Sequence, residues 1–200
     1  MQVKSGRRSN AERTRAMRDR LVATARALFV AQGYAETSTP ALVTAAGVTR
    51  GALYHHFADK RALFRAVVEA EAEAVAQAIE AADDRAESAL DRLLAGADAY
   101  LTAMAEPGRT RLLLVEAPAV LGEAERRCIE DTRGDATLRE GLEAAIEAGA
   151  LRPLPVAVLA PILSAAFERA AESMAAGAEP AACRTVVRAL IAGLTGRGDT

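Results

Sequence analysis

Apolar residues recur three and four positions apart along most of this chain of 200 residues. A clear example is the run Leu21, Val22, Ala25, Leu28 and Phe29. This spacing matches the 3.6-residue turn of an α-helix and places the side chains on one face. Alanine, the strongest helix former, accounts for 49 residues. The pattern therefore predicts an all-α fold.

Capping and turn residues divide the pattern into about nine helices. Ser9 with Glu12 forms a capping box, Thr49 and Asp59 are N-cap candidates, and Gly33 and Gly47 are placed to end helices. The apolar run 112–115 has no second strand candidate near it, so we expect a helix there. The expected helices cover residues 10–32, 41–46, 50–57, 60–79, 90–104, 112–115, 119–148 (with a break at Gly134 left open), 156–176 and 181–194.

The charge of the chain is divided between its two ends. The formal net charge is −2, but residues 1–65 carry 12 Lys and Arg against 4 Asp and Glu, and residues 66–200 carry 13 against 23. Five of the seven aromatic residues lie between residues 29 and 64, which indicates a small core of its own. We predict a mobile basic arm over 1–8, a basic domain over 9–66 that faces a polyanion, and an acidic domain over 67–200.

Several classes of protein are excluded. The sequence has no apolar run near 18 residues and no apolar segment typical of a signal peptide, so we expect a cytoplasmic protein without membrane contact. Cys128 and Cys183 lie far apart and are interpreted as reduced thiols. The histidines, His55 and His56, are adjacent and cannot easily share one ion, so no metal or cofactor is predicted. The motifs GxSxG, GxGxxG and the P-loop are absent, so we do not expect an enzyme.

The two short helices after the first long one are typical of a helix-turn-helix. In the segment 49–57, Leu53 and Phe57 would face the core, and small Gly51 and Ala52 would allow close approach to a major groove. Arg50 would read a guanine edge or contact a phosphate or solvent. Tyr54 would bind a phosphate or pack half-buried.

Residues 37–57, with Lys60 and Leu63-Phe64, resemble the DNA-binding domain of the TetR family of transcriptional regulators. The run Ala46-Gly47-Val48-Thr49, then Gly51, Leu53-Tyr54, His56-Phe57, Lys60 and Leu63 follows the family pattern nearly completely; Pro40 and Val43 depart from it. The resemblance implies a homodimer on a near-palindromic double-stranded operator, with recognition helices roughly 34–36 Å apart. The implied DNA contacts are Ser38, Thr39, Thr49, Arg50, Gly51, Ala52, Tyr54, His55, His56 and Lys60. His55 and His56 would contact phosphates or remain solvated, and the arm would enter a minor groove or stay a disordered tail.

The rest of the chain matches the family's helical ligand and dimerisation domain by helix number and length. Dimerisation would use the last two helices, 156–176 and 181–194, although an internal pair of core helices gives the same pattern. A small-molecule effector, more aliphatic than aromatic, would bind between helices. The candidate pocket residues, which ordinary core packing also explains, are Leu94, Ala97, Leu101, Met104, Leu113, Glu116, Leu142 and Phe167. Glu116 would orient the ligand or form a salt bridge with Arg109 or Arg111.

The sequence is therefore interpreted as a ligand-responsive repressor released from DNA by its effector. The alternative is a DNA-binding architectural or adaptor protein without an effector.

Overall fold

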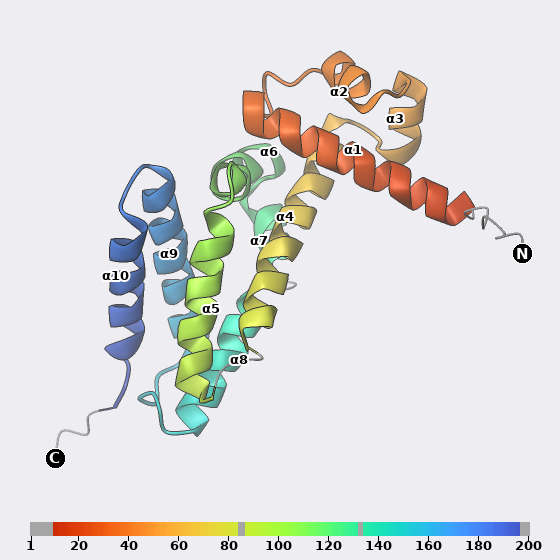
Figure 1. Ribbon diagram of the computed structural model, residues 1–200. Helices are drawn as coiled ribbons and strands as arrows, with labels where there is room; N and C mark the ends of the chain where they lie inside the picture. The colour runs from red at the N-terminus through yellow and green to blue at the C-terminus, as the bar shows by residue number, and fades with distance from the viewer. Residues whose placement is uncertain (1–9, 84–86, 132–133, 197–200) are drawn as a thin grey trace, which may run out of the picture. The chain divides into compact units, whose positions relative to one another are not determined.

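The computed structural model describes residues 10–83, 87–131 and 134–196 (Figure 1). These residues form ten α-helices and one π-helical segment and contain no strand, which confirms the all-α prediction. The predicted arm and the capping residue Ser9 lie outside the described residues. The elements are α1 (Asn10–Gln32), α2 (Thr39–Ala46), α3 (Arg50–His56), α4 (Lys60–Asp83), α5 (Ala89–Met104), η1 (Arg111–Glu116), α6 (Ala117–Leu121), α7 (Glu123–Asp131), α8 (Gly134–Glu147), α9 (Val156–Ala175) and α10 (Pro180–Ala192).

The chain divides into two compact units, Met1–Val67 and Val68–Thr200. In the first unit, α1 packs against α2, and α2 packs against α3. Its centre is aromatic: the ring of Phe64 lies 5.3 Å from that of Phe29 and 4.9 Å from that of Tyr34, both edge to face. This geometry is favourable between aromatic rings and gives the small unit a core of its own.

The second unit is a bundle in which α5 packs against α8, α9 and α10 (Figure 1). Leu101 of α5 and Leu142 of α8 are fully buried where these helices meet, and Ile191 of α10 is buried as well. No helix among the described residues is long and apolar enough to cross a membrane.

Two differences from the predicted helices have a local physical cause. The stretch 119–148 is not one helix, because Gly122 adopts a positive φ of 89° and separates α6 from α7. Helix α2 begins at Thr39 rather than residue 41, because the Ser38 hydroxyl accepts a hydrogen bond from the amide of Ala41 (3.3 Å). The run 112–115 is helical, as predicted, and its turns are π-helical.

Candidate DNA interface and ligand cavity

Helix α3 is short and is fixed at both ends by its own sequence. The Thr49 side chain accepts a hydrogen bond from the amide of Ala52 (3.1 Å), which confirms Thr49 as its N-cap. The helix stops at Phe57, whose backbone is extended. Leu53 and Phe57 are buried, as expected from their spacing. The opposite side of α3 therefore faces outward.

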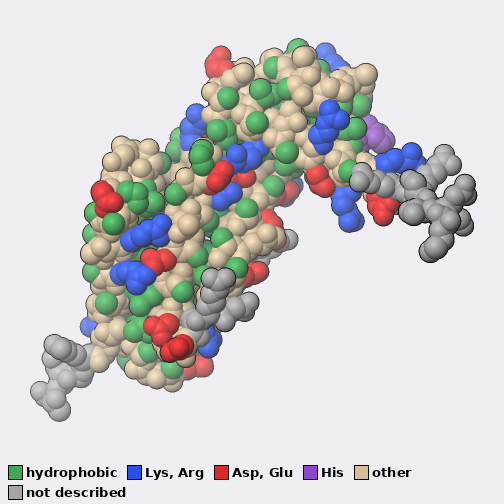
Figure 2. Space-filling view, viewed as in Figure 1, with side chains coloured by type: hydrophobic (Ala, Val, Ile, Leu, Met, Phe, Trp, Pro, Cys, Tyr) green, Lys and Arg blue, Asp and Glu red, His purple; other side chains and the backbone are tan. Residues whose placement is uncertain are grey.

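The outward side of α3 combines small and polar residues. Arg50, Gly51, Tyr54 and His55 are exposed, and Figure 2 shows histidine at the surface of the first unit. A Cβ added at Gly51 would meet nothing nearer than the Thr49 hydroxyl at 4.0 Å. The structure thus places these predicted DNA contacts on one accessible face, with Ala52 and His56 half-buried at its edges.

Tyr54 joins α3 to the start of α2. Hydrogen bonds with Thr39, and then with Arg50, hold the pKa of the Tyr54 phenol below its ordinary value. The Arg50 guanidinium also lies 5.4 Å from the centre of the Tyr54 ring. With Ser38 at the N-terminus of α2, these residues form a polar patch whose hydroxyls and charge suit phosphate oxygens.

Two arginines of α1 bind the C-terminal ends of α2 and α3. Arg18 donates a hydrogen bond to the carbonyl of His56 (3.2 Å) and lies 4.4 Å from the centre of the Phe57 ring. Arg20 donates to the carbonyl of Ala46, the last residue of α2. Helix C-termini carry unpaired carbonyls and partial negative charge, so a guanidinium stabilises them. The positioning role of these two arginines has no local sequence signal.

Lys60 also makes contacts within its own unit. Its ammonium donates hydrogen bonds to the carbonyls of Tyr34 (2.9 Å) and Thr37 (3.0 Å) and lies 4.1 Å from the centre of the Tyr34 ring. These contacts fix α4 to the loop between α1 and α2. An ammonium has three donors, and these two carbonyls use two of them. The contact of Lys60 with a DNA phosphate stays a prediction, and Lys60 also positions α4.

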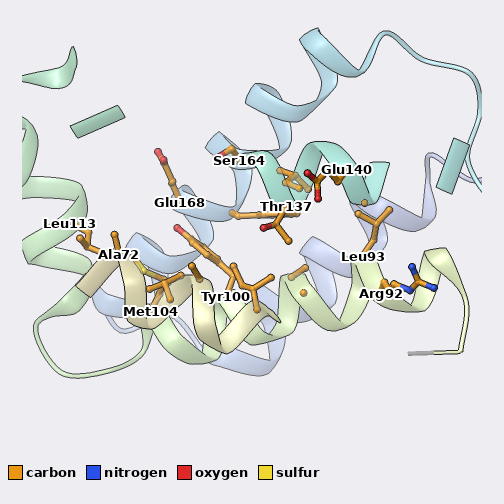
Figure 3. A pocket seen from close by; sticks show the side chains of 18 of the residues that line it. Ala72, Arg92, Leu93, Tyr100, Met104, Leu113, Thr137, Glu140, Ser164 and Glu168 are labelled. Carbon is orange, nitrogen blue, oxygen red and sulfur yellow. The ribbon is translucent and has the colours of Figure 1, made fainter. Parts of the chain in front are cut away.

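The second unit contains a cavity of about 330 Å³ lined by α4, α5, η1, α7, α8 and α9 (Figure 3). Among the predicted pocket residues, four line it: Ala97, Met104, Leu113 and Phe167. The other four do not: Leu94, Leu101, Glu116 and Leu142. The spacing of apolar residues identifies the inner side of a helix but not which part of that side borders a void.

Three of the four residues that do not line the cavity have other structural roles. Leu101 and Leu142 are fully buried in the packed core. The Glu116 carboxylate forms a salt bridge with Arg111 (3.2 Å), one of the two partners that we considered for it.

The cavity has polar residues that the sequence reasoning missed. Tyr100 and Ser164 contribute hydroxyls, and Arg92 and Glu140 contribute charges. Tyr100 is one of the two aromatic residues that follow residue 64, and this is the one sequence signal that could have pointed to it. Glu168, a further lining residue, is paired with Arg126 (3.3 Å).

Arg126 is the centre of a small ion-pair cluster near this wall. It is buried and binds Glu123 as well as Glu168 (2.9 Å and 3.3 Å). Hydrogen bonds from Arg126 and Arg127 lower the pKa of Glu123 to about 2. The cluster links α7 to α9 and fixes the Glu168 side of the cavity.

Helices α9 and α10 expose an apolar stripe. Val158 and Ile162 are 57% and 62% exposed, and Val186 and Leu190 are 60% and 45% exposed. Each pair is four residues apart, so its members share one face of their helix. The two helices pack against each other. An exposed apolar surface of this kind is typical of a protein interface.

The first unit is a helix-turn-helix with an exposed polar recognition helix, and the second is a helical bundle with a cavity. Within the described residues, no group of three or more His, Cys, Asp or Glu side chains could hold a metal ion. This is the architecture of a DNA-binding regulator with a separate helical domain.

Comparison with known proteins identifies the family. Residues 21–67 match the sequence model of the bacterial regulatory proteins of the tetR family, and residues 90–196 match that of the tetracyclin repressor-like C-terminal domain. The chain therefore belongs to the TetR family of transcriptional regulators. A search of curated proteins found no match.

Solved structures agree with this assignment. A TetR-family transcriptional regulator from Pectobacterium atrosepticum is 31% identical, with a TM-score of 0.75, covering 95% of this chain and 99% of that one. Reduced NemR from E. coli is 21% identical (TM-score 0.73; 92% and 100% covered). The fatty acid degradation regulator FadR from Bacillus halodurans is 14% identical (TM-score 0.78; 96% and 99% covered). The last two show the shared fold alone.

Proposed function

We propose that this chain is a ligand-responsive repressor that acts in the cytoplasm as a homodimer. Regulators of this family are generally DNA-binding proteins without enzymatic activity. The observation that carries the proposal is the outward face of α3, where Arg50, Tyr54 and His55 surround the open surface at Gly51. A helix of this shape and chemistry suits the major groove of DNA.

Each predicted DNA contact has a place in this proposal. Arg50 reads a base edge, and Gly51 and Ala52 allow close approach. Phosphate contacts come from the remaining residues: Ser38, Thr39, Thr49, Tyr54, His55, His56 and Lys60.

The apolar stripe on α9 and α10 supports dimerisation through these helices, an arrangement typical of the family. Two heads would then reach successive major grooves of a near-palindromic operator. The cavity of the second unit supports an effector site, whose occupation would favour the conformation that releases DNA.

The test is fluorescence anisotropy with the upstream region of the chain's own gene and with random DNA, at several salt concentrations. We expect at least about a 1000-fold preference for the specific DNA, and affinity that falls steeply with salt because phosphates are contacted. Arg50→Ala should reduce the preference, whereas Arg13→Ala, also on an exposed arginine, should leave it unchanged. Equal binding to both DNAs by the unmodified chain would overturn the proposal.

A further inference from the structure

The cavity of the second unit extends along α5. Its α5 wall begins at Ala89 and ends at Met104, fifteen residues further along the helix. That wall is about 22 Å long at 1.5 Å per residue, and the cavity beside it has a volume of about 330 Å³. Figure 3 shows the same extent, with Leu113 and Ala72 toward one end and Arg92 at the other. An extended hydrocarbon chain suits a cavity of this length.

The walls of the cavity are mainly aliphatic. Glycine and alanine on facing helices, such as Gly96 of α5 and Ala144 of α8, leave the slot open. The two aromatic rings, Tyr100 and Phe167, are 6.2 Å apart and tilted by 41°, so they do not form parallel plates around a flat ligand. Such walls gain most from burying methylene groups.

The two ends of the cavity differ in burial and charge. Met104 and Leu113 are buried (3% and 4% exposed) and close one end, and the charged lining residue on that side, Glu168, is paired with Arg126 (Figure 3). Arg92 and Glu140 are exposed at the other end. Among the described residues that line the cavity, Arg92 is the one Lys or Arg. It lies in the first turns of α5, where the helix dipole also favours an anion.

We propose that the cavity binds a straight-chain aliphatic carboxylate, with its chain along α5 and its carboxylate on the guanidinium of Arg92. An arginine can bind a carboxylate through two parallel hydrogen bonds. Glu140 has a negative charge, like the carboxylate of this ligand, and repels it. The proposal rests on the proposed function in one respect, namely that the cavity is the effector site.

Isothermal titration calorimetry of the full chain tests the ligand class, with octanoate, dodecanoate and hexadecanoate below their micellar concentrations. We expect one site per chain and affinity that rises from octanoate to dodecanoate, roughly fourfold for each methylene buried. Dodecylamine should bind at least about tenfold more weakly than dodecanoate. No saturable binding of any of these carboxylates, or tighter binding of the amine, would overturn the proposal.

Variants at the charged end distinguish a direct contact between Arg92 and the carboxylate from a structural role of Arg92. Arg92→Gln should weaken dodecanoate about tenfold and leave dodecanol unchanged. Glu140→Gln should strengthen dodecanoate, because it removes a like charge. Equal effects of Arg92→Gln on dodecanoate and dodecanol would contradict the placement of the carboxylate.

A variant at the closed end tests the direction of the chain. Ala72→Leu shortens the slot and should weaken hexadecanoate while sparing octanoate. Ala70→Leu, at an exposed position of the same helix, is the matched control. If Ala72→Leu affects both chain lengths equally, the proposed orientation is wrong.

DNA anisotropy with the same compounds separates this inference from the proposed function. Carboxylate binding without release of DNA would support the ligand class and contradict ligand-responsive repression. Release of DNA by another class of compound, with no carboxylate bound, would overturn the ligand class alone.

Discussion

The pKa of Tyr54 tests the contact between α2 and α3 in the absence of DNA. Hydrogen bonds with Thr39 and Arg50 lower its pKa, whereas burial, and then the charge of Asp59, raises the pKa of Tyr34. We predict that Tyr54 titrates at lower pH than Tyr34 in an NMR titration of the tyrosine rings. Thr39→Val should move the pKa of Tyr54 upward, toward its ordinary value, and Ser38→Ala should not. An unchanged pKa in Thr39→Val would show that this hydrogen bond is absent in solution.

A second prediction at the residue scale concerns Lys60, which binds two backbone carbonyls in addition to any phosphate. Lys60→Met leaves these carbonyls without their donor and should lower the free energy of unfolding by about 1–2 kcal/mol. It should also weaken binding to all DNA sequences about equally. Urea unfolding checks the first effect, with Arg13→Met as an exposed control. Unchanged stability of Lys60→Met would mean that the lysine serves DNA alone.

The distance in sequence between partners decides which residue roles were predictable. The caps of α3 and α4 were predictable because Thr49 and Asp59 bind amides only three residues away. Arg18 and Arg20 bind carbonyls 38 and 26 residues away. Such contacts depend on how the helices pack, and one sequence contains no signal for that.

At the scale of elements, the helices were predictable, but the cavity was predictable only in part. Ala97, Leu101 and Met104 share the inner side of α5, and the same periodicity describes all three. Ala97 and Met104 border the cavity and Leu101 fills the core. The difference arises because α5 packs against several helices, α8, α9 and α10, and which part of its inner side each one covers is a property of the packed bundle.

The ion pair between Arg109 and Glu71 connects elements of the second unit, and the prediction at the scale of elements concerns this pair. Arg109 binds Glu71 of α4 (2.9 Å) and the carbonyl of Ala103 in α5 (2.7 Å), and both charged side chains are nearly buried. Arg109→Ala leaves a buried carboxylate without this partner and should lower the free energy of unfolding by about 3 kcal/mol. The control is Arg111→Ala, which breaks a more exposed pair with Glu116 and should cost less than about 1 kcal/mol. Equal losses in urea unfolding would contradict this ranking.

At the scale of the whole molecule, charge and apolar surface belong to different units. The net positive charge lies in the part of the chain that carries α3, whereas the exposed apolar stripe lies on α9 and α10. The net charge of −2 conceals this division. The proposed DNA surface and the proposed dimer surface therefore lie on different units, so a variant can change the residues of one surface without changing those of the other.

The apolar stripe supplies the prediction that uses this separation. The double variant Ile162→Glu with Val186→Glu places four like charges at the proposed face between two copies, so in sedimentation velocity we expect a monomer for the variant and a dimer for the unmodified chain. Both side chains are exposed, so the variant should retain its helical circular dichroism. Its affinity for the operator should fall sharply, because a single head has lost the linked second contact. Val115→Glu, an exposed apolar position on η1, should remain a dimer; a double variant that also remains a dimer would place the interface elsewhere.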